Sequence, residues 1–285
     1  MKIRSIRRRS LLYRLSRAVV LGVVLGLGGL TACQHKLIYL PAKYPPETVK
    51  FFEKSGGTRL EFTTSQGKQT AWFSPAAGGA VPEHVWIVCA GNADLALNYA
   101  EIQGEGGFEK DAFVFFDYPG YGGCGGSPNP DRIRESFKAL GPMITERAQL
   151  PAGALAERGI IFGHSLGAAA GLIAAEEYGI RRAVLISPFT SLMEMTRVVL
   201  HAPLGFLVRH RFDNHQTLAS LMARGGHAWI FHGDEDRIIP MRMSQELAAE
   251  SGTGVTFKAV KGAGHNDVLP HGWAEIQSAM EAARK

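Results

Sequence analysis

Acidic residues are absent from the first 33 positions of this 285-residue chain, although the chain holds 26 Asp and Glu in all. Seven of its 31 Lys and Arg lie in the same segment: Lys2, Arg4, Arg7, Arg8, Arg9, Arg14 and Arg17. The other 24 basic residues face all 26 acidic ones, so the rest of the chain has a formal charge of −2. The pI near 9.2 therefore reflects the N-terminal segment, and we expect no nucleic-acid partner.

The N-terminal segment also lacks an apolar run long enough to span a membrane. Its apolar stretch covers Ala18 to Leu30, which is short of the roughly 20 residues that a spanning helix needs. A basic start, an apolar stretch and then small residues are the layout of an export signal. We predict a signal peptide over residues 1–32, with a short signal-anchor as the alternative.

The end of this segment, Leu30-Thr31-Ala32-Cys33, resembles the lipobox of bacterial lipoproteins. The resemblance implies cleavage before Cys33 and lipidation of its thiol. Several acyl chains at this position would anchor the protein stably. The implied location is the periplasmic face of the cell envelope. Gln34, in place of Asp, favours the outer membrane over the inner. A secreted protein with an incidental cysteine is the alternative.

Internal repeats and long Pro, Gly or Ser linkers are also absent, which indicates one domain after the leader. Residues 33–50 are predicted to form an N-terminal tether, extended from Leu37 to Pro46 where prolines and aromatics gather. Residues 51–285 are predicted to form the domain itself, with a short lid at about 188–227.

Short continuous apolar runs alternate with helix-like segments through this domain. Such runs are typical of strands buried on both faces. The predicted strands are Val85 to Cys89, Ala112 to Phe116, Gly159 to Phe162, Ala183 to Ile186, Ala228 to Phe231 and Val255 to Val260, after a hairpin of 59–64 and 69–74. The predicted helices are Asp131 to Gln149, Leu166 to Tyr178, Met241 to Ser251 and His271 to Arg284. The pattern predicts an α/β fold, a mostly parallel, doubly wound sheet of about eight strands.

Ligands bind at the carboxyl ends of the strands in such a sheet, and the sequence Gly163-His164-Ser165-Leu166-Gly167 follows one of them. This Gly-x-Ser-x-Gly pattern between a strand and a helix is typical of a nucleophilic serine on a sharp turn. Ser165 is the candidate nucleophile. The backbone N–H of Leu166, at the start of the helix, is a candidate oxyanion donor, and Asn92 N–H, after the first parallel strand, is the other.

A serine nucleophile needs a base and an acid that orients the base. His265 follows the last predicted strand and is the candidate base. Three acids, Asp234, Glu235 and Asp236, crowd the loop after the strand before it, and Asp267 lies two residues beyond His265.

Several motifs resemble an ABHD-like family of α/β-hydrolases that carry a Gly-Asn-Ala oxyanion loop. They are Gly91-Asn92-Ala93, Asp117-Tyr118-Pro119-Gly120-Tyr121-Gly122 and Ser187-Pro188-Phe189-Thr190-Ser191-Leu192. The similarity runs from about Leu37 to Ala283, and it selects Asp236, four positions after His232, as the triad acid. Ala90 and Pro119 replace a His and an Arg of the family, so support of the oxyanion loop is expected to differ.

The resemblance implies an α/β-hydrolase fold and a serine hydrolase that cleaves an ester of a small-molecule acyl substrate. A peptidase or amidase, or a non-catalytic envelope lipoprotein that binds a lipid or a partner, are the alternatives. The spacing of the ten histidines matches no metal site, so neither a metal nor an organic cofactor is expected. The family topology brings the strands of Cys89 and Cys124 together, which leaves a disulfide possible. Apolar lid residues could line an acyl pocket or cover the sheet.

Overall fold

The computed structural model describes residues 21–22, 26, 28–29, 31, 34–105, 107–202 and 204–285. Most of the predicted signal peptide, and Cys33 with its predicted lipidation, lie outside the described residues. Within the described part, no helix combines the length and the apolar character that crossing a membrane requires.

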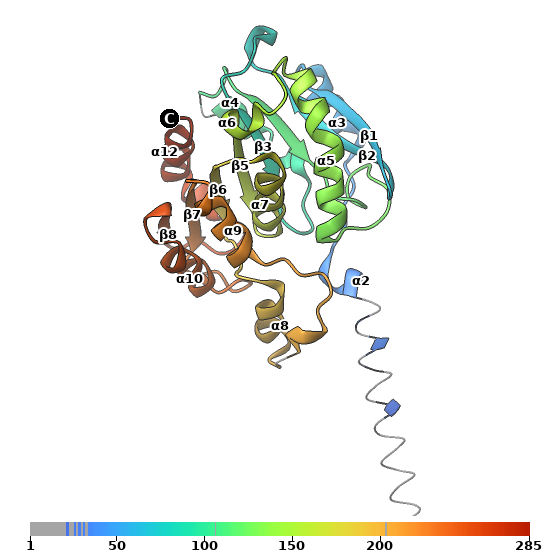
Figure 1. Cartoon of the computed structure of the whole chain (residues 1–285), viewed down its shortest axis with the longest axis vertical. Coiled ribbons are helices and arrows are strands. Elements are labelled where there is room, and N and C mark those ends of the chain that lie inside the picture. Colours follow the sequence, from blue (N-terminus) through green and yellow to red (C-terminus); the bar gives the residue numbers. More distant parts are fainter. Residues whose placement is uncertain are drawn as a thin grey trace, which may run out of the picture.

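An eight-stranded sheet forms the centre of the molecule, with the order β1-β2-β4-β3-β5-β6-β7-β8 (Figure 1). Strand β2 is antiparallel to both of its neighbours, and every other neighbouring pair is parallel. The strands are β1 (Thr58–Thr64), β2 (Gly67–Ser74), β3 (Val85–Cys89), β4 (Ala112–Phe116), β5 (Gly159–His164), β6 (Arg182–Ile186), β7 (His227–Gly233) and β8 (Val255–Val260). The predicted mostly parallel, doubly wound sheet is confirmed.

Helices cover both faces of the sheet because its central strands are apolar on both sides. Along β3, Val85, Ile87 and Cys89 face one core, and Trp86 and Val88 face the other. The first core packs against α5 (Pro130–Arg147), α7 (Leu166–Tyr178), α9 (Asn214–Ala223) and α10 (Met241–Ser251). The second packs against α3 (Pro46–Lys54), α4 (Glu101–Glu105) and α12 (Trp273–Ala283). This burial on both faces explains why the strands are continuous apolar runs.

Two predicted elements differ from the observed ones. The tether is not extended throughout, because α2 (Gln34–Ile38) and α3 bracket a short irregular stretch. Pro46 is the first residue of α3, where the fixed φ of proline suits a helix start. The predicted last helix, His271 to Arg284, is observed as α12, which begins after Gly272, and a short helix α11 (Val268–His271) precedes it.

The predicted lid contains α8 (Leu192–Leu200), a short 3-10 turn η3 (Gly205–Leu207) and α9. A β-bridge between Ser191 and Asp213 closes the base of the excursion, and each of these residues also caps the helix that follows it. Because α9 packs on the sheet, the part that stands away from the sheet is α8 and η3, seen at the lower end of Figure 1.

Cys89 and Cys124 do not form the disulfide that the sequence left open, since both thiols are free. Cys89 is buried at the end of β3, and burial raises the pKa of its thiol. Cys124 Sγ lies 3.4 Å from the backbone oxygen of Thr70, to which it donates, in the neighbouring hairpin strand.

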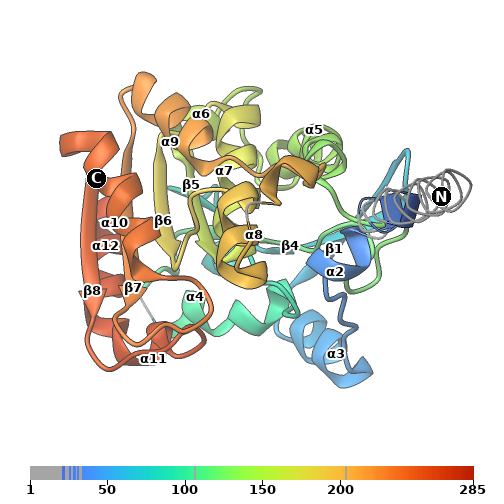
Figure 2. The ribbon, with the colours of Figure 1, turned by 90° about the horizontal axis from the view of Figure 1, so that it is seen from below.

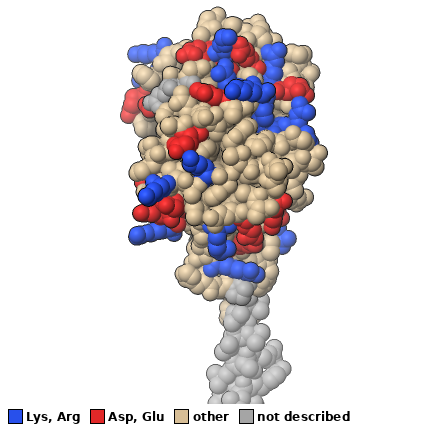
Figure 3. Space-filling model, turned by 90° about the vertical axis from the view of Figure 1, so that its left-hand side faces the viewer, with Lys and Arg blue, Asp and Glu red and all other residues tan. Residues whose placement is uncertain are grey.

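Charged side chains of both signs are interspersed on the face that Figure 3 shows, and no extended field of one sign covers it. This mixture agrees with the near-neutral formal charge of the chain after its leader.

Candidate active site

The turn between β5 and α7 holds Ser165 in a strained conformation. Its φ is +55° and its ψ is −115°, and its side chain is at the surface of a cavity with only 8% of the residue exposed. The turn is tight enough to require glycine on both sides. A Cβ on Gly163 would lie 2.4 Å from Gly167 O, and one on Gly167 would lie 2.0 Å from Cys89 O. The Gly-x-Ser-x-Gly spacing thus follows from close backbone packing.

His265 and Asp236 meet beside this turn. His265 Nδ1 lies 2.6 Å from Asp236 Oδ2, and both side chains are almost completely buried. The other carboxylate oxygen, Oδ1, accepts hydrogen bonds from the backbone N–H groups of Ile238 (2.8 Å) and Ile239 (2.9 Å). The structure therefore brings together the acid and the base that the sequence selected. Asp234 instead accepts from Gly262 N, and Asp267 lies at the start of α11.

A second histidine, His232, also contacts the Asp236 carboxylate. His232 Nε2 lies 3.1 Å from Asp236 Oδ2 and 2.9 Å from Ile239 O, so this nitrogen carries a proton. Burial alone would raise the pKa of Asp236, but the hydrogen bonds from both histidines and from Ile239 N–H hold that pKa well below its usual range. Asp236 is therefore a carboxylate at neutral pH.

His164, next to Ser165, ties the turn to the loop of His265. Its Nε2 donates to the backbone oxygen of His265 over 3.1 Å, and its Nδ1 lies 2.8 Å from the hydroxyl of Tyr99. A carbonyl oxygen only accepts, so the proton is on Nε2 and Nδ1 accepts from Tyr99. Burial, and then the charge on His265, lower the pKa of His164 to about 4. The sequence analysis assigned His164 no role beyond its place in the Gly-x-Ser-x-Gly motif.

Ser165 and His265 line one cavity of about 620 Å³. Among the described residues, the Ser165 hydroxyl makes no hydrogen bond to His265 or to any other side chain. Such bonds are commonly long without substrate and tighten in the complex.

The oxyanion loop is held by three side chains of the Asp117 to Gly122 motif. Tyr118 donates to Ala90 O, and Tyr121 donates to Asn92 Oδ1 over 2.6 Å. Asp117 Oδ1 accepts from Ala96 N over 3.1 Å. These contacts support the loop in this chain, in which Ala90 and Pro119 replace the family's His and Arg.

Two backbone N–H groups belong to residues of the cavity wall. Asn92 and Leu166 both line the cavity, and neither backbone N–H is hydrogen-bonded to another described residue. The Asn92 side chain is used for anchoring, because its Nδ2 donates to Ile38 O over 2.7 Å and its Oδ1 accepts from Leu40 N over 3.0 Å. The two N–H groups are thus available to an oxygen of a ligand.

The N-terminal segment also lines the cavity, which the sequence did not reveal. Gln34, Leu37, Ile38 and Leu40 all contribute to its wall. Only the apolar character of Leu37, Ile38 and Leu40 was visible in the sequence, since the partners of this segment are far along the chain.

The lid supplies most of the remaining wall. Its contribution is apolar and consists of Leu192, Met195, Val199, Leu200, Leu204 and Leu207, together with other residues of the same segment. Of the two possibilities that the sequence left open for these residues, lining a pocket is the one observed for this part of the lid.

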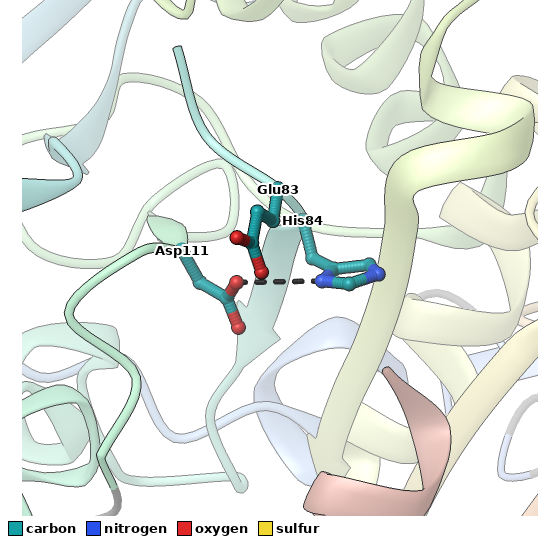
Figure 4. Close-up of side chains that lie close together, drawn as sticks. All are labelled: Glu83, His84 and Asp111. Atoms are coloured by element: carbon teal, nitrogen blue, oxygen red, sulfur yellow. Dashed lines mark hydrogen bonds and ion pairs between the residues drawn. The ribbon is translucent and has the colours of Figure 1, made fainter. Parts of the chain in front are cut away.

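One group of potential metal ligands lies at the opposite end of the strands, where Glu83, His84 and Asp111 precede β3 and β4 (Figure 4). The Asp111 carboxylate already has partners within the protein. Asp111 Oδ2 accepts from Trp86 Nε1 over 2.9 Å and pairs with Arg284 Nε at 3.0 Å. These contacts explain the cluster as a link between α12 and the sheet. A second group consists of Glu194 on α8, His215 on α9 and Glu246 on α10.

Comparisons with known proteins agree with this architecture. A model of the alpha/beta hydrolase family matches residues 97–225. An uncharacterised protein of Mycobacterium tuberculosis is 28% identical over 235 residues, which cover 82% of this chain and 81% of the relative. Human alpha/beta hydrolase domain-containing protein 17B is 29% identical over 157 residues, covering 55% of this chain and 51% of the relative.

Solved structures show the same fold. An esterase of Pyrococcus furiosus superposes with a TM-score of 0.64 at 16% identity, over 87% of this chain and 99% of that one. The esterase domain of a Rhodothermus marinus protein gives a TM-score of 0.57 at 15% identity, over 80% of this chain and 98% of that one.

Proposed function

We propose that the chain is a member of the α/β-hydrolase superfamily and that it is a serine hydrolase that cleaves a carboxylic ester through an acyl-enzyme on Ser165. The observation that carries the proposal is the buried Asp236–His265 pair beside a strained serine, at the floor of an apolar cavity. This combination of nucleophile, base and orienting acid is what acyl transfer requires.

In the proposed first step, Ser165 Oγ attacks the ester carbonyl carbon while His265 Nε2 takes the hydroxyl proton. Asp236 holds the proton on His265 Nδ1, which keeps Nε2 free to accept, and stabilises the imidazolium that forms. The tetrahedral oxyanion accepts hydrogen bonds from the N–H groups of Asn92 and Leu166. A donor of this kind contributes about 10²–10³ to the rate.

In the second step, the C–O bond of the ester breaks and the alcohol leaves with the proton from His265. Water then attacks the acyl-enzyme, His265 takes a proton from that water, and the carboxylic acid is released when Ser165 is reprotonated. No metal or organic group is needed for either step.

The wall of the cavity supports an acyl substrate over a peptide. The lid side chains that line it are mostly apolar, and Leu37, Ile38 and Leu40 add to the same surface. An ester also needs less help for its leaving group than an amide. The fold that the chain shares with two esterases is in keeping with this choice.

We also propose that Cys33 carries a lipid that anchors the protein at the periplasmic face of the cell envelope. The support is the match of residues 30–33 to a lipobox. Intact mass of the purified protein tests it, because the Cys33→Ser variant would lose the added acyl mass.

The enzymatic proposal is tested by labelling the full-length protein with a fluorophosphonate probe, followed by hydrolysis of p-nitrophenyl esters of increasing chain length. We expect labelling and turnover to vanish in Ser165→Ala. They should persist in Ser251→Ala, whose hydroxyl bonds only Leu247 O in α10. A folded wild-type protein that takes no label would contradict the proposal and favour a lipoprotein that binds a lipid or a partner.

A further inference from the structure

Exposed apolar side chains gather around the mouth of the cavity. Five large ones, each more than half exposed, also line the cavity: Leu37, Leu40, Val199, Leu200 and Ile238. Phe206, 64% exposed, and Met193 belong to the same lid elements, η3 and α8. The other exposed large apolar side chains of the described residues are Leu21, Phe51 and Val81. Exposed apolar surface in this protein is thus concentrated at one place, which marks an interaction surface.

We define the apolar rim as the seven exposed residues at the cavity mouth: Leu37, Leu40, Met193, Val199, Leu200, Phe206 and Ile238. They come from three segments of the chain, namely 34–40, the lid and the loop that contains Ile238. Figure 2, seen from below, shows α2 and α8 at the same end of the molecule, as does Figure 1. A surface built from three separate segments requires each of them to be held in place.

The N-terminal segment is held by polar contacts on both sides. The Gln34 side chain donates to Leu207 O and accepts from Arg209 N over 2.7 Å. At the other end of the segment, Leu40 N donates to Asn92 Oδ1. The chain therefore bridges the lid and the oxyanion loop. Gln34 is one peptide bond from Cys33, so the proposed lipid attachment point is covalently next to the cavity wall.

The rim segments carry exposed cations, and exposed acids adjoin these segments at Asp213, Asp234 and Glu235. The rim segments 34–40, 192–211 and 237–239 contain five exposed cations, which are Lys36, Arg197, Arg209, Arg211 and Arg237. Their single acid, Glu194, is partly buried and accepts a hydrogen bond from the Thr190 hydroxyl. Apolar side chains with cations among them suit the surface of a bilayer, into which apolar groups insert while cations meet lipid phosphates.

We infer that the apolar rim docks on a lipid bilayer and that the substrate is an acyl ester of a membrane lipid, whose chain passes from the bilayer into the cavity. The substrate assignment rests on the proposed function, whereas the docking surface does not. A second copy of this chain fits the rim less well, because a symmetric contact would bring the two sets of cations together and cover the cavity mouth.

The reaction on such a lipid balances without any further reactant. Ser165 takes the acyl group, the ester C–O bond breaks, and the deacylated lipid leaves with the proton that His265 held. Water then releases the fatty acid.

The docking surface is tested without catalysis, in full-length Ser165→Ala protein that also carries F206W or F51W. Each is mixed with vesicles of phosphatidylcholine and phosphatidylglycerol whose acyl chains are brominated, and tryptophan quenching is compared with that of the parent. Phe51 is an exposed control outside the cavity wall. We expect added quenching for F206W and none for F51W. Equal quenching of the two variants would overturn the docking surface.

The substrate class is tested in active protein with F206E and, as control, F51E. We expect F206E to lower hydrolysis of phospholipid in vesicles at least about tenfold relative to F51E, because an apolar anchor becomes a charge. Hydrolysis of soluble p-nitrophenyl acetate should stay equal, since Phe206 does not line the cavity. Equal phospholipid hydrolysis by both variants would overturn the inference, as would a dimer that F206E dissociates without loss of vesicle activity. Quenching of F206W without turnover of either ester would support the docking surface and contradict the enzymatic proposal.

Discussion

His265 Nδ1 lies 2.6 Å from Asp236 Oδ2, and the opposite oxygen of the same carboxylate is occupied by two backbone N–H groups. The carboxylate is thereby fixed in rotation as well as in place, and its low pKa keeps it charged at neutral pH. It can orient His265 in one tautomer only, with the proton on Nδ1.

Replacing Asp236 by Asn should lower kcat for a short p-nitrophenyl ester by about 10⁴, because the amide can stabilise the wrong tautomer of His265. Circular dichroism should show an intact fold. Asp234→Asn and Asp267→Asn are the matched controls and should stay within about twofold of the wild-type protein, since neither carboxylate reaches His265. A loss in Asp267→Asn that exceeds the loss in Asp236→Asn would transfer the role of acid to Asp267.

His232 is expected to act as a positioning residue through Asp236. Its Nε2 donates toward Asp236 Oδ2 over 3.1 Å, and its Nδ1 lies 2.7 Å from Ser244 Oγ. A hydrogen bond to a charged group contributes about 1.5–3 kcal/mol, so His232→Leu should lower kcat by about 10–100-fold with little change in KM. His232→Gln keeps a donor at this place and should recover part of the loss. A rise in KM at constant kcat would contradict the role.

Gly167 should tolerate no larger residue, because a Cβ there would lie 2.0 Å from Cys89 O and 2.5 Å from Ala90 O. Both contacts are with backbone, which cannot move aside without displacing the oxyanion loop. We expect Gly167→Ala to lower the free energy of unfolding by about 3 kcal/mol or more in urea titrations. The control is Gly123→Ala, whose new Cβ would have its nearest neighbour 3.9 Å away. Equal unfolding midpoints for the two variants would refute this packing argument.

The sheet, and the three residues proposed as the triad, could be selected from the sequence because their signals are local. Strands buried on both faces are continuous apolar runs, and the bounds of β3, β4 and β8 agree with the prediction. Residues at the carboxyl ends of neighbouring parallel strands must converge, which is why Ser165, Asp236 and His265 could be selected before any geometry was known.

The wall of the cavity was not predictable in the same way. Gln34 contacts Leu207, 173 positions along the chain, and no periodicity in a segment as short as 34–40 indicates such a partner. In α8, the same apolar stripe would suit either a core or a pocket, because both bury it. His164 was equally ambiguous, since its contacts to Tyr99 and His265 come from two distant loops.

The contacts of His164 lead to a prediction about acid stability. In the folded protein its pKa is lowered to about 4 by burial and by the neighbouring His265, against an ordinary value of 6.5. Between these values the unfolded chain binds the proton and the folded protein does not. Stability therefore falls as the pH falls from about 6.5 toward 4, and one such group contributes at most about 1.4 kcal/mol per pH unit.

His164→Gln removes this titration while keeping an amide that can donate to His265 O. Urea unfolding between pH 4 and pH 7 should give a shallower dependence for this variant than for the wild-type protein. Tyr99→Phe, which removes the hydroxyl that donates to Nδ1, should make protonation of the folded ring easier, raise its pKa toward the ordinary value and so reduce the loss of stability in this pH range. Parallel curves for His164→Gln and the wild-type protein would mean that His164 is protonated alike in both states.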